Sequence, residues 1–188
     1  MKNSNNKGFD QHFNVQIAVD QSSLLIVSTF LSNHPNDQLD RLSTVDAISL
    51  RVGKPQRAAL DTGYFSITNI DGFLSRQIEP YIATGRPAHH VSVQALLQQS
   101  QTPPEETASP KVKMQYKLQT DIGKEIYRLR KCTVEPVFGI IKETMGFRQF
   151  SLRGLTKAAG EWSLVCLAFN LRRLQTLILK KTTSPTGC

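Results

Sequence analysis

The chain has 188 residues, enough for one domain with a hydrophobic core, and its formal net charge is +8. Its three cysteines form no CxxC pair, which excludes the usual zinc-binding pattern and predicts reduced thiols in a cytoplasmic protein. The most apolar run, near the C-terminus, is interrupted by Asn170, Arg172 and Arg173, so no membrane span is predicted.

The positive charge is concentrated in the C-terminal part of the chain. Residues 1–110 contain 8 Lys and Arg against 10 Asp and Glu, whereas residues 111–188 contain 15 against 5. Phosphate contacts dominate the affinity of proteins for nucleic acids, so this half favours DNA as a partner. A solvated basic surface without a partner gives the same count.

The first predicted elements are strands. Residues 14–20 alternate apolar and polar side chains, which is the period of a half-buried strand. A second strand is predicted over 24–30, after the turn-forming residues 20–23, so the two are expected to form an antiparallel hairpin. Apolar residues at helical spacing then predict a helix over 36–50.

A short strand is predicted over 57–60, and it ends at Asp61, just before the turn residue Gly63. Open α/β sheets commonly place ligand-binding groups at the C-terminal ends of their strands. Asp61 is therefore a candidate metal ligand. The alternative is that it only caps the following turn.

The basic half contains a second candidate carboxylate, Glu135. On one continuous helix, Arg128, Lys131 and Lys142 would share its face, because they lie seven, four and seven residues away. On such a face the carboxylate could bind a metal ion and the cations could bind phosphate. A solvated helix with ordinary ion pairs between neighbouring turns is the alternative.

Pro136 follows Glu135 directly and disfavours helical geometry at Glu135. Either the helix kinks there or a new helix begins with Pro136 at its start. In the second case Arg128 and Lys131 would not share the face of Glu135, although Lys142 still would. Farther along, Arg148 and Arg153 are candidates for contacts to DNA phosphates, and the helical spacing around Trp162 predicts core packing.

The run from Tyr127 through Lys142, followed by GFRQFSLRGL and GEWSLVCLAFNLRRL, resembles the C-terminal part of bacterial insertion-sequence transposases of the DDE class. Upstream, four further segments resemble successive pieces of the same domain, so the resemblance covers most of residues 8–175: FNVQIAVD, LLIVSTFLSNHPND, AALDTGYFS and IEPYIATGR. It implies a ribonuclease-H-like α/β fold, a mixed sheet with flanking helices. It also implies DNA cleavage by two metal ions, Mg²⁺ or Mn²⁺, held by Asp, Asp and Glu.

Within this family the pattern is Tyr, two residues, Arg, three residues, Glu, six residues, Lys. Glu135 and Lys142 keep their mutual spacing, whereas Tyr127 and Arg130 keep theirs one position upstream. Lys131 therefore occupies the Arg slot and Arg128 the Tyr slot. The resemblance implies that Glu135 binds the metal and that these cations contact DNA.

Asp61 matches the second catalytic Asp of the family. The first lies in an Asp-Pro-acidic motif on the first strand, just before the part that corresponds to residues 2–13. This chain contains no Asp-Pro dipeptide, so the first strand and its carboxylate are expected to be missing. Of the possible substitutes, Asp10 is expected in a loop and Asp20 in the hairpin turn. Two-metal chemistry needs two ions held about 3.5–4 Å apart. Because one of the carboxylates that hold them is expected to be missing, little catalysis is expected.

We therefore expect residues 1–188 to form one partial DDE catalytic domain. It would consist of a strand-rich half (8–97), an exposed polar loop (98–112) and a basic helical half (113–181). The expected function is transposase-type DNA cleavage and strand transfer, defective here, within an oligomer of transposase subunits. The alternatives are a non-catalytic fragment that binds DNA or joins a transposase assembly, and an unproductive fragment that folds poorly.

Overall fold

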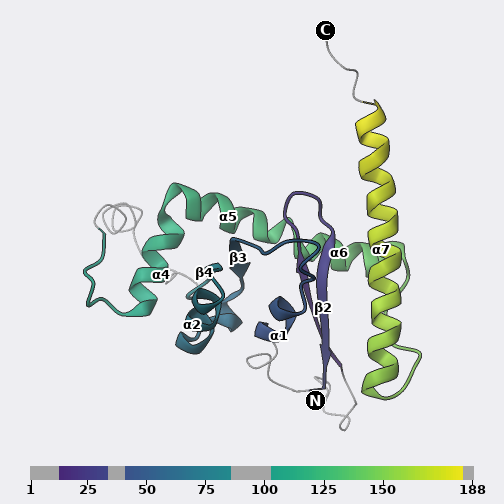
Figure 1. Ribbon diagram of the computed structural model, residues 1–188, viewed down its shortest axis with the longest axis horizontal. Coiled ribbons are helices and arrows are strands. Elements are labelled where there is room, and N and C mark those ends of the chain that lie inside the picture. The colour runs from purple at the N-terminus through teal and green to yellow at the C-terminus, as the bar shows by residue number, and fades with distance from the viewer. Residues whose placement is uncertain (1–12, 34–40, 86–102, 184–188) are drawn as a thin grey trace. The chain divides into compact units, whose positions relative to one another are not determined.

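The computed structural model describes residues 13–33, 41–85 and 103–183, and these residues have mixed α/β structure (Figure 1). The chain divides into two compact units. The first contains residues 1–53 and 132–188, and the second contains residues 54–131.

The first unit contains the predicted hairpin. Strands β1 (Asn14–Val19) and β2 (Ile26–Ser32) are antiparallel, with Ile17 opposite Thr29. The second strand begins two residues later than predicted. This is because Leu24 has a positive φ of 58° and donates its N–H to the carbonyl of Asp20, so it belongs to the turn. The Asp20 carboxylate accepts the N–H of Ser23, which places Asp20 in the hairpin turn as expected.

Helix α1 (Arg41–Asp46) contacts both strands of the hairpin. It is the described part of the helix predicted over 36–50. Residues 36–40 lie outside the described residues. The helix ends at Asp46, so residues 47–50, which were also predicted to be helical, are not. Polar contacts join α1 to the hairpin, since the Thr44 hydroxyl donates to Gln16 Oε1 at 3.2 Å.

The core of the first unit lies between β2 and the C-terminal helices. It is formed with α6 (Val134–Gly139), the π-helical turn η2 (Ile140–Thr144) and the long helix α7 (Leu155–Thr183). The buried members of this core come from β2, α6, η2 and α7: Ile26, Val137, Ile141, Trp162, Cys166 and Phe169. The predicted core position of Trp162 is confirmed, because its side chain is buried and donates a hydrogen bond to Thr29 Oγ1.

The second unit is built on a strand-helix-strand segment. Strands β3 (Arg57–Leu60) and β4 (Glu79–Ile82) are parallel, and they are connected through η1 (Thr62–Tyr64) and α2 (Ile67–Ser75). Strand β3 has the predicted bounds.

Helices α4 (Pro110–Gln119) and α5 (Asp121–Lys131) pack against this pair. Ser109 caps α4 by accepting the N–H of Val112, so the predicted loop 98–112 ends earlier than expected. Residues 98–102 of that loop lie outside the described residues.

Two expectations need correction. The described strands form two separate two-stranded sheets instead of one mixed sheet, because each pair hydrogen-bonds within its own unit. The continuous helix through Glu135 is also wrong. Helix α5 ends at Lys131 and α6 begins at Val134, because Pro136 fits only the first turn, where a backbone N–H has no helical partner. Of the two alternatives, a new helix is confirmed, but it begins at Val134, so Pro136 is its third residue and not its first.

Candidate functional site

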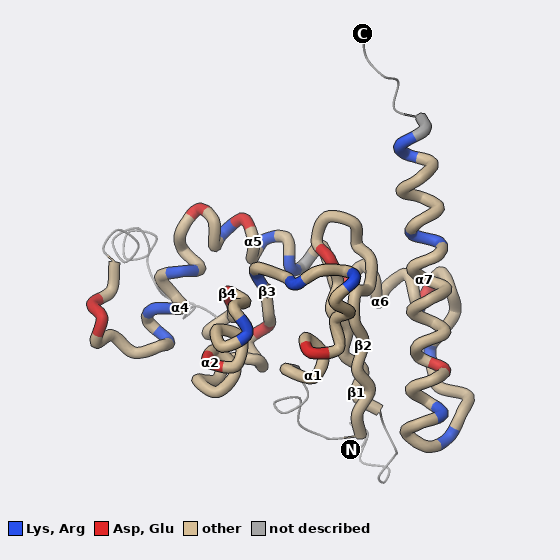
Figure 2. The backbone as a smooth tube through the Cα atoms, in the orientation of Figure 1, with Lys and Arg blue, Asp and Glu red and all other residues tan. Residues whose placement is uncertain are grey.

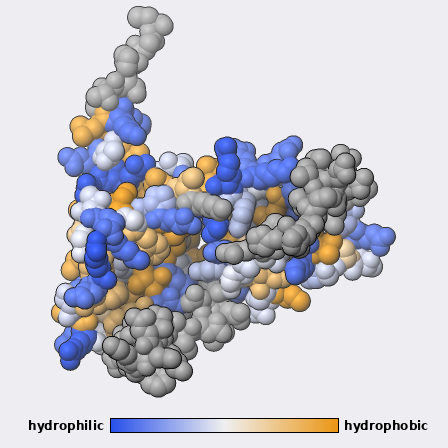
Figure 3. Space-filling model, turned by 180° about the vertical axis from the view of Figure 1, so that it is seen from behind, coloured by the Kyte–Doolittle hydropathy of each residue, from blue (hydrophilic) through white to orange (hydrophobic). Residues whose placement is uncertain are grey.

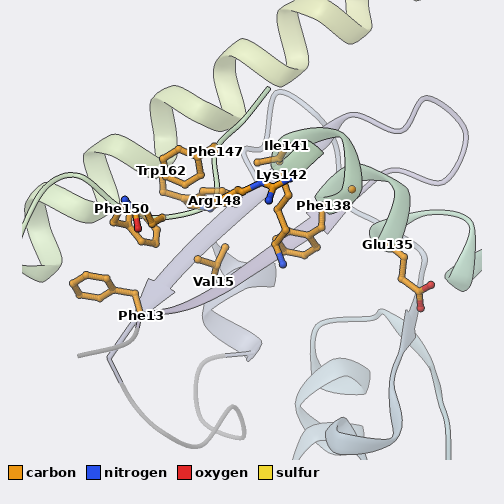
Figure 4. Close-up of a pocket in the computed structure, with 12 residues that line it drawn as sticks. Phe13, Val15, Glu135, Phe138, Ile141, Lys142, Phe147, Arg148, Phe150 and Trp162 are labelled. Atoms are coloured by element: carbon orange, nitrogen blue, oxygen red, sulfur yellow. The ribbon is translucent and has the colours of Figure 1, made fainter. Parts of the chain in front are cut away.

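A cavity of about 620 Å³ opens beside α6 in the first unit. Apolar side chains of β1, α6, η2, α7 and the segment that leads to α7 line most of it (Figure 4): Val15, Phe138, Ile141, Phe147, Phe150 and Trp162. Three of the residues predicted to be functional also line it, namely Glu135, Lys142 and Arg148. The structure therefore brings one candidate metal ligand and two candidate phosphate contacts to one cavity.

Glu135 lies in the first turn of α6, where the helix dipole favours a negative charge. Its side chain is exposed, and its carboxylate points away from the aromatic side chains of the cavity (Figure 4). This orientation leaves the carboxylate oxygens accessible from solvent. Glu135 can therefore accept a cation without losing any packing in the core.

Lys142 is exposed on η2, and its ammonium nitrogen lies 6.0 Å from the centroid of the Phe138 ring. At this distance the attraction between cation and ring is weak, about 0.5–1 kcal/mol for an exposed pair. Among the described residues, no carboxylate forms an ion pair with Lys142. Its charge is therefore available to an anion that enters the cavity.

Arg148 differs from Lys142, because its Nη2 donates to Glu143 Oε2 at 2.6 Å. Both side chains are 69% exposed, and exposed ion pairs contribute only about 0–1 kcal/mol. A phosphate can therefore replace Glu143 at little cost. Glu143 was not singled out in the sequence, where it is one acidic residue beside Lys142.

Arg153 is exposed in the segment before α7. This segment is attached to α7 by Glu161, whose carboxylate accepts the backbone N–H groups of Ser151 and Leu152 at 2.9–3.1 Å. These hydrogen bonds lower the pKa of Glu161. No sequence pattern indicated this role for Glu161, since the contact depends on how the loop folds back.

Asp61 lies in the second unit, at the C-terminal end of β3. Its Oδ1 accepts the N–H of Thr62 at 2.7 Å, so Asp61 caps the turn that follows β3. Its Oδ2 lies 3.5 Å from Nη1 of Arg130 on α5. The Arg130 side chain is only 17% exposed and lies against the Tyr127 ring, 5.1 Å from its centroid. Arg130 is thus directed to Asp61, and its Nε has no hydrogen-bond partner among the described residues.

The remaining two predicted DNA contacts are also on α5. Arg128 is exposed, and Lys131 is the last residue of the helix. Because α5 ends before α6 begins, neither residue shares a helix with Glu135. The spacing argument that linked them to Glu135 is therefore wrong, although Arg128 remains a cation on an exposed helical surface.

Asp61 and Glu135 are ligands of a type that binds divalent metal ions, but the described residues do not bring enough such ligands together. Carboxylate oxygens are the ligands that Mg²⁺ prefers, and Asp61 and Glu135 both supply them. However, no group of three or more His, Cys, Asp or Glu side chains in the described ranges is arranged to hold a metal ion. The two oxygens of Asp61 also interact with Thr62 and Arg130.

Comparison with known protein families finds one match. Residues 96–175 match the family model of the transposase DDE domain. This stretch, less than half of the chain, is similar to part of a transposase DDE domain. The matched part includes Glu135, Lys142, Arg148 and Arg153, whereas Asp61 lies before it. Searches of curated proteins and of solved structures found no match.

The match connects residues 96–175 with transposition. None of the helices in the described ranges has the length and apolarity that crossing a membrane requires.

Proposed function

We propose that this DDE segment binds DNA through phosphate contacts around the Glu135 cavity, and that it descends from an enzyme that cleaves and transfers the strands of an insertion sequence. The observation that carries the proposal is the DDE family match over residues 96–175, because the matched part contains the cavity residues Glu135, Lys142 and Arg148. Both compact units would be parts of one catalytic domain of ribonuclease-H-like ancestry.

In this proposal the cations hold the DNA backbone. Lys142 and Arg148 would contact phosphates at the cavity, and Arg153 and Arg128 would add exposed positive charge. Such contacts position DNA without reading its sequence. Arg130 and Lys131 would add further positive charge for DNA. Arg130 could do so only after its ion pair with Asp61 is broken.

Asp61 and Glu135 would be two ligands of the divalent ion, Mg²⁺ or Mn²⁺. When bound, the ions of such a site activate a water molecule and stabilise the leaving oxygen. The role of this chain is to supply the carboxylates and to hold the phosphodiester beside them. A counterpart of the first catalytic Asp of the family is not found in these 188 residues. We therefore propose that they do not cleave DNA by themselves.

A second candidate function is a non-catalytic one, in which the chain binds DNA or joins an assembly of transposase subunits. The contacts of Asp61 favour it, because both oxygens of a proposed metal ligand already have partners within the protein. In such a chain the phosphate contacts remain, and the carboxylates only stabilise the fold. The chain would then compete with an active transposase for DNA or for subunits.

A DNA-binding and nicking assay on the whole chain tests these functions. We expect binding of a labelled duplex that weakens steeply with salt, as counterion release requires, and no nicking in Mg²⁺ or Mn²⁺. Nicking that disappears in Asp61→Asn and Glu135→Gln would instead establish catalysis. A folded monomer without DNA affinity at low salt would contradict both functions.

A further inference from the structure

The segment between η2 and α7 carries two of the proposed phosphate contacts, Arg148 and Arg153. It covers residues 145–154, has no regular secondary structure, and is called the basic segment below. Both arginines are exposed. Because an irregular segment has no helix or sheet hydrogen bonds of its own, it keeps one conformation only where other elements anchor it. Its anchors therefore decide where the two charges lie.

Aromatic packing anchors the first half of the basic segment. The ring centroids of Phe147 and Phe150 lie 6.0 and 6.4 Å from that of Trp162, which is buried on α7. The two phenylalanine rings also meet edge to face, with 5.3 Å between their centroids. Arg148 lies between these phenylalanines in the sequence, so packing holds its backbone on both sides.

The second half is anchored differently. Ser151 and Leu152 are exposed, and the Leu152 side chain contributes little packing at 48% exposure. Their anchor is Glu161, the residue before Trp162 on α7. Its Oε2 accepts the N–H of Ser151 at 3.1 Å and the N–H of Leu152 at 3.0 Å. Hydrogen bonds to a carboxylate are stronger than those between neutral groups, so one side chain can hold this part of the backbone.

Arg153 lies between two such anchors. Leu152, on one side, donates to Glu161. On the other side, the carbonyl of Gly154 accepts the N–H of Ala158 at 3.0 Å, where the chain enters α7. The Arg153 side chain makes no hydrogen bond or ion pair with the residues that the structure describes. Only the backbone on its two sides therefore positions its charge.

The charge of Glu161 is unusual for its surroundings. It is the one acidic residue in the sequence after Glu143, whereas the same part contains seven Lys and Arg, as Figure 2 shows for α7 and the segment before it. Figure 3 shows hydrophilic side chains along α7, with apolar surface between them. A carboxylate on a basic surface opposes DNA binding through its charge. If charge were its only effect, removing Glu161 would strengthen binding.

We propose that Glu161 is a positioning residue for DNA binding, which holds the backbone beside Arg153 so that this guanidinium meets a DNA phosphate. Glu161 acts through its hydrogen bonds and against the effect of its own charge. It acts on Arg153 and not on Arg148, because aromatic packing holds Arg148. The inference rests on the proposed function, since it concerns how one phosphate contact of that function is held in place.

Two variants with the same net charge test this role. Glu161→Ala removes the carboxylate and its hydrogen bonds, whereas Glu161→Gln removes the same charge but keeps an acceptor oxygen. Fluorescence anisotropy with a labelled duplex should show binding by Glu161→Ala that is at least about threefold weaker than binding by Glu161→Gln. The slope of log affinity against log salt concentration should also be smaller by about one unit, because one phosphate contact is lost. Equal affinities and slopes would overturn the proposal.

A second comparison tests whether the effect passes through Arg153. The difference between Glu161→Ala and Glu161→Gln should disappear when Arg153→Ala is added to both, because the contact that Glu161 positions is then absent. Adding Arg148→Ala to both should leave the difference intact. A difference that persists without Arg153 would overturn this part of the proposal.

Hydrogen exchange measures the anchoring directly. The amide protons of Ser151 and Leu152 should exchange faster in Glu161→Ala than in Glu161→Gln, whereas the amide of Phe169 in the core should stay equally protected. Unchanged exchange at Ser151 and Leu152 would contradict the anchoring. If Glu161→Ala does not fold, Glu161→Asp replaces it, because its shorter side chain keeps the charge but withdraws the acceptor from the basic segment. It should bind DNA more weakly than Glu161→Gln.

The same binding assay separates this inference from the proposed function. A folded parent chain that binds no duplex at low salt would contradict the proposed function itself. A parent chain that binds DNA, together with Glu161→Ala and Glu161→Gln variants that bind equally, would overturn only the positioning role of Glu161.

Discussion

The guanidinium Nη1 of Arg130 lies 3.5 Å from Oδ2 of Asp61. The pair joins a proposed DNA contact to a proposed metal ligand, and both belong to the second compact unit. Neither residue can serve its proposed role fully while the pair is intact. The charge of Arg130 must therefore be displaced before Asp61 binds a divalent ion.

Arg130→Gln is expected to raise the affinity of the chain for Mn²⁺. A positive charge at this distance opposes a second cation, and for a partly exposed pair its removal should strengthen binding by about two- to tenfold. Isothermal titration with Mn²⁺ measures the change. Arg57→Gln is the matched control, because Arg57 pairs with Glu79 at 3.8 Å in the same unit. An equal gain in both variants would contradict a specific role for Arg130.

Lys142→Ala should weaken binding to all DNA sequences by a similar factor, because a phosphate contact reads no bases. The slope of log affinity against log salt concentration should fall by about one unit. Fluorescence anisotropy at several salt concentrations gives both quantities. Lys157→Ala removes an exposed charge outside the cavity and should have the smaller effect. The role of Lys142 is wrong if the two variants behave alike.

Glu143→Gln should strengthen DNA binding, because it removes the carboxylate that accepts the 2.6 Å hydrogen bond from Arg148. The gain should be about two- to fivefold, the scale of an exposed ion pair. It should disappear when Arg148→Ala is added. If the gain persists in the double variant, it comes from the general reduction in negative charge and not from Arg148.

Asn170→Ala should destabilise the protein by about 2–4 kcal/mol, because two backbone groups of β2 would lose their partners. The amide of Asn170 accepts the N–H of Ile26 at 2.9 Å and donates to the carbonyl of Ile26 at 2.8 Å. Denaturant unfolding measures the loss. Gln175→Ala, an exposed change on the same helix, should stay within about 0.5 kcal/mol of the parent. Equal losses would show that Asn170 does not hold α7 to β2.

Cys166 should resist alkylation in the folded protein, whereas the exposed Cys132 should react. Burial raises the pKa of the Cys166 thiol from 9.0 to about 11, although a hydrogen bond with Thr29 acts in the opposite direction. Peptide mass spectrometry after iodoacetamide treatment at pH 8 distinguishes the two thiols. Rapid modification of Cys166 under native conditions would contradict its place in the core.

The same shift predicts a pH dependence of stability. The unfolded chain ionises Cys166 near its ordinary pKa of 9.0, whereas the folded protein keeps the proton up to about 11. The stabilising contribution is therefore complete below about pH 9 and is lost as the pH rises toward 11. Unfolding free energies of the parent and of Cys166→Ala should converge in this window. Parallel curves would be the contrary result.

The sequence predicted the elements that local patterns determine. The alternation in β1, the strand that ends at Asp61 and the core position of Trp162 all follow from the periodicity of neighbouring residues. The break between α5 and α6 was one of two alternatives, and Pro136 decided it through a local effect.

The sequence did not predict contacts between residues that are distant along the chain. Nothing near Asp61 indicates its pairing with Arg130, because the pair depends on how α5 packs against β3. The division of the strands into two sheets likewise depends on hydrogen bonds between distant segments. The same holds for Glu161, which acts only because the segment before α7 folds back onto it.

The most direct test of the central claim is a double-mutant cycle on Mn²⁺ binding, followed by electron paramagnetic resonance in the presence of a DNA duplex. If Asp61 and Glu135 are ligands of one ion, Asp61→Asn and Glu135→Gln should each weaken binding by about tenfold, and the double variant should be little worse than either. Asp121→Asn, an exposed carboxylate on α5, should have no effect. Losses that simply add, or an affinity that neither substitution changes, would contradict a shared metal site.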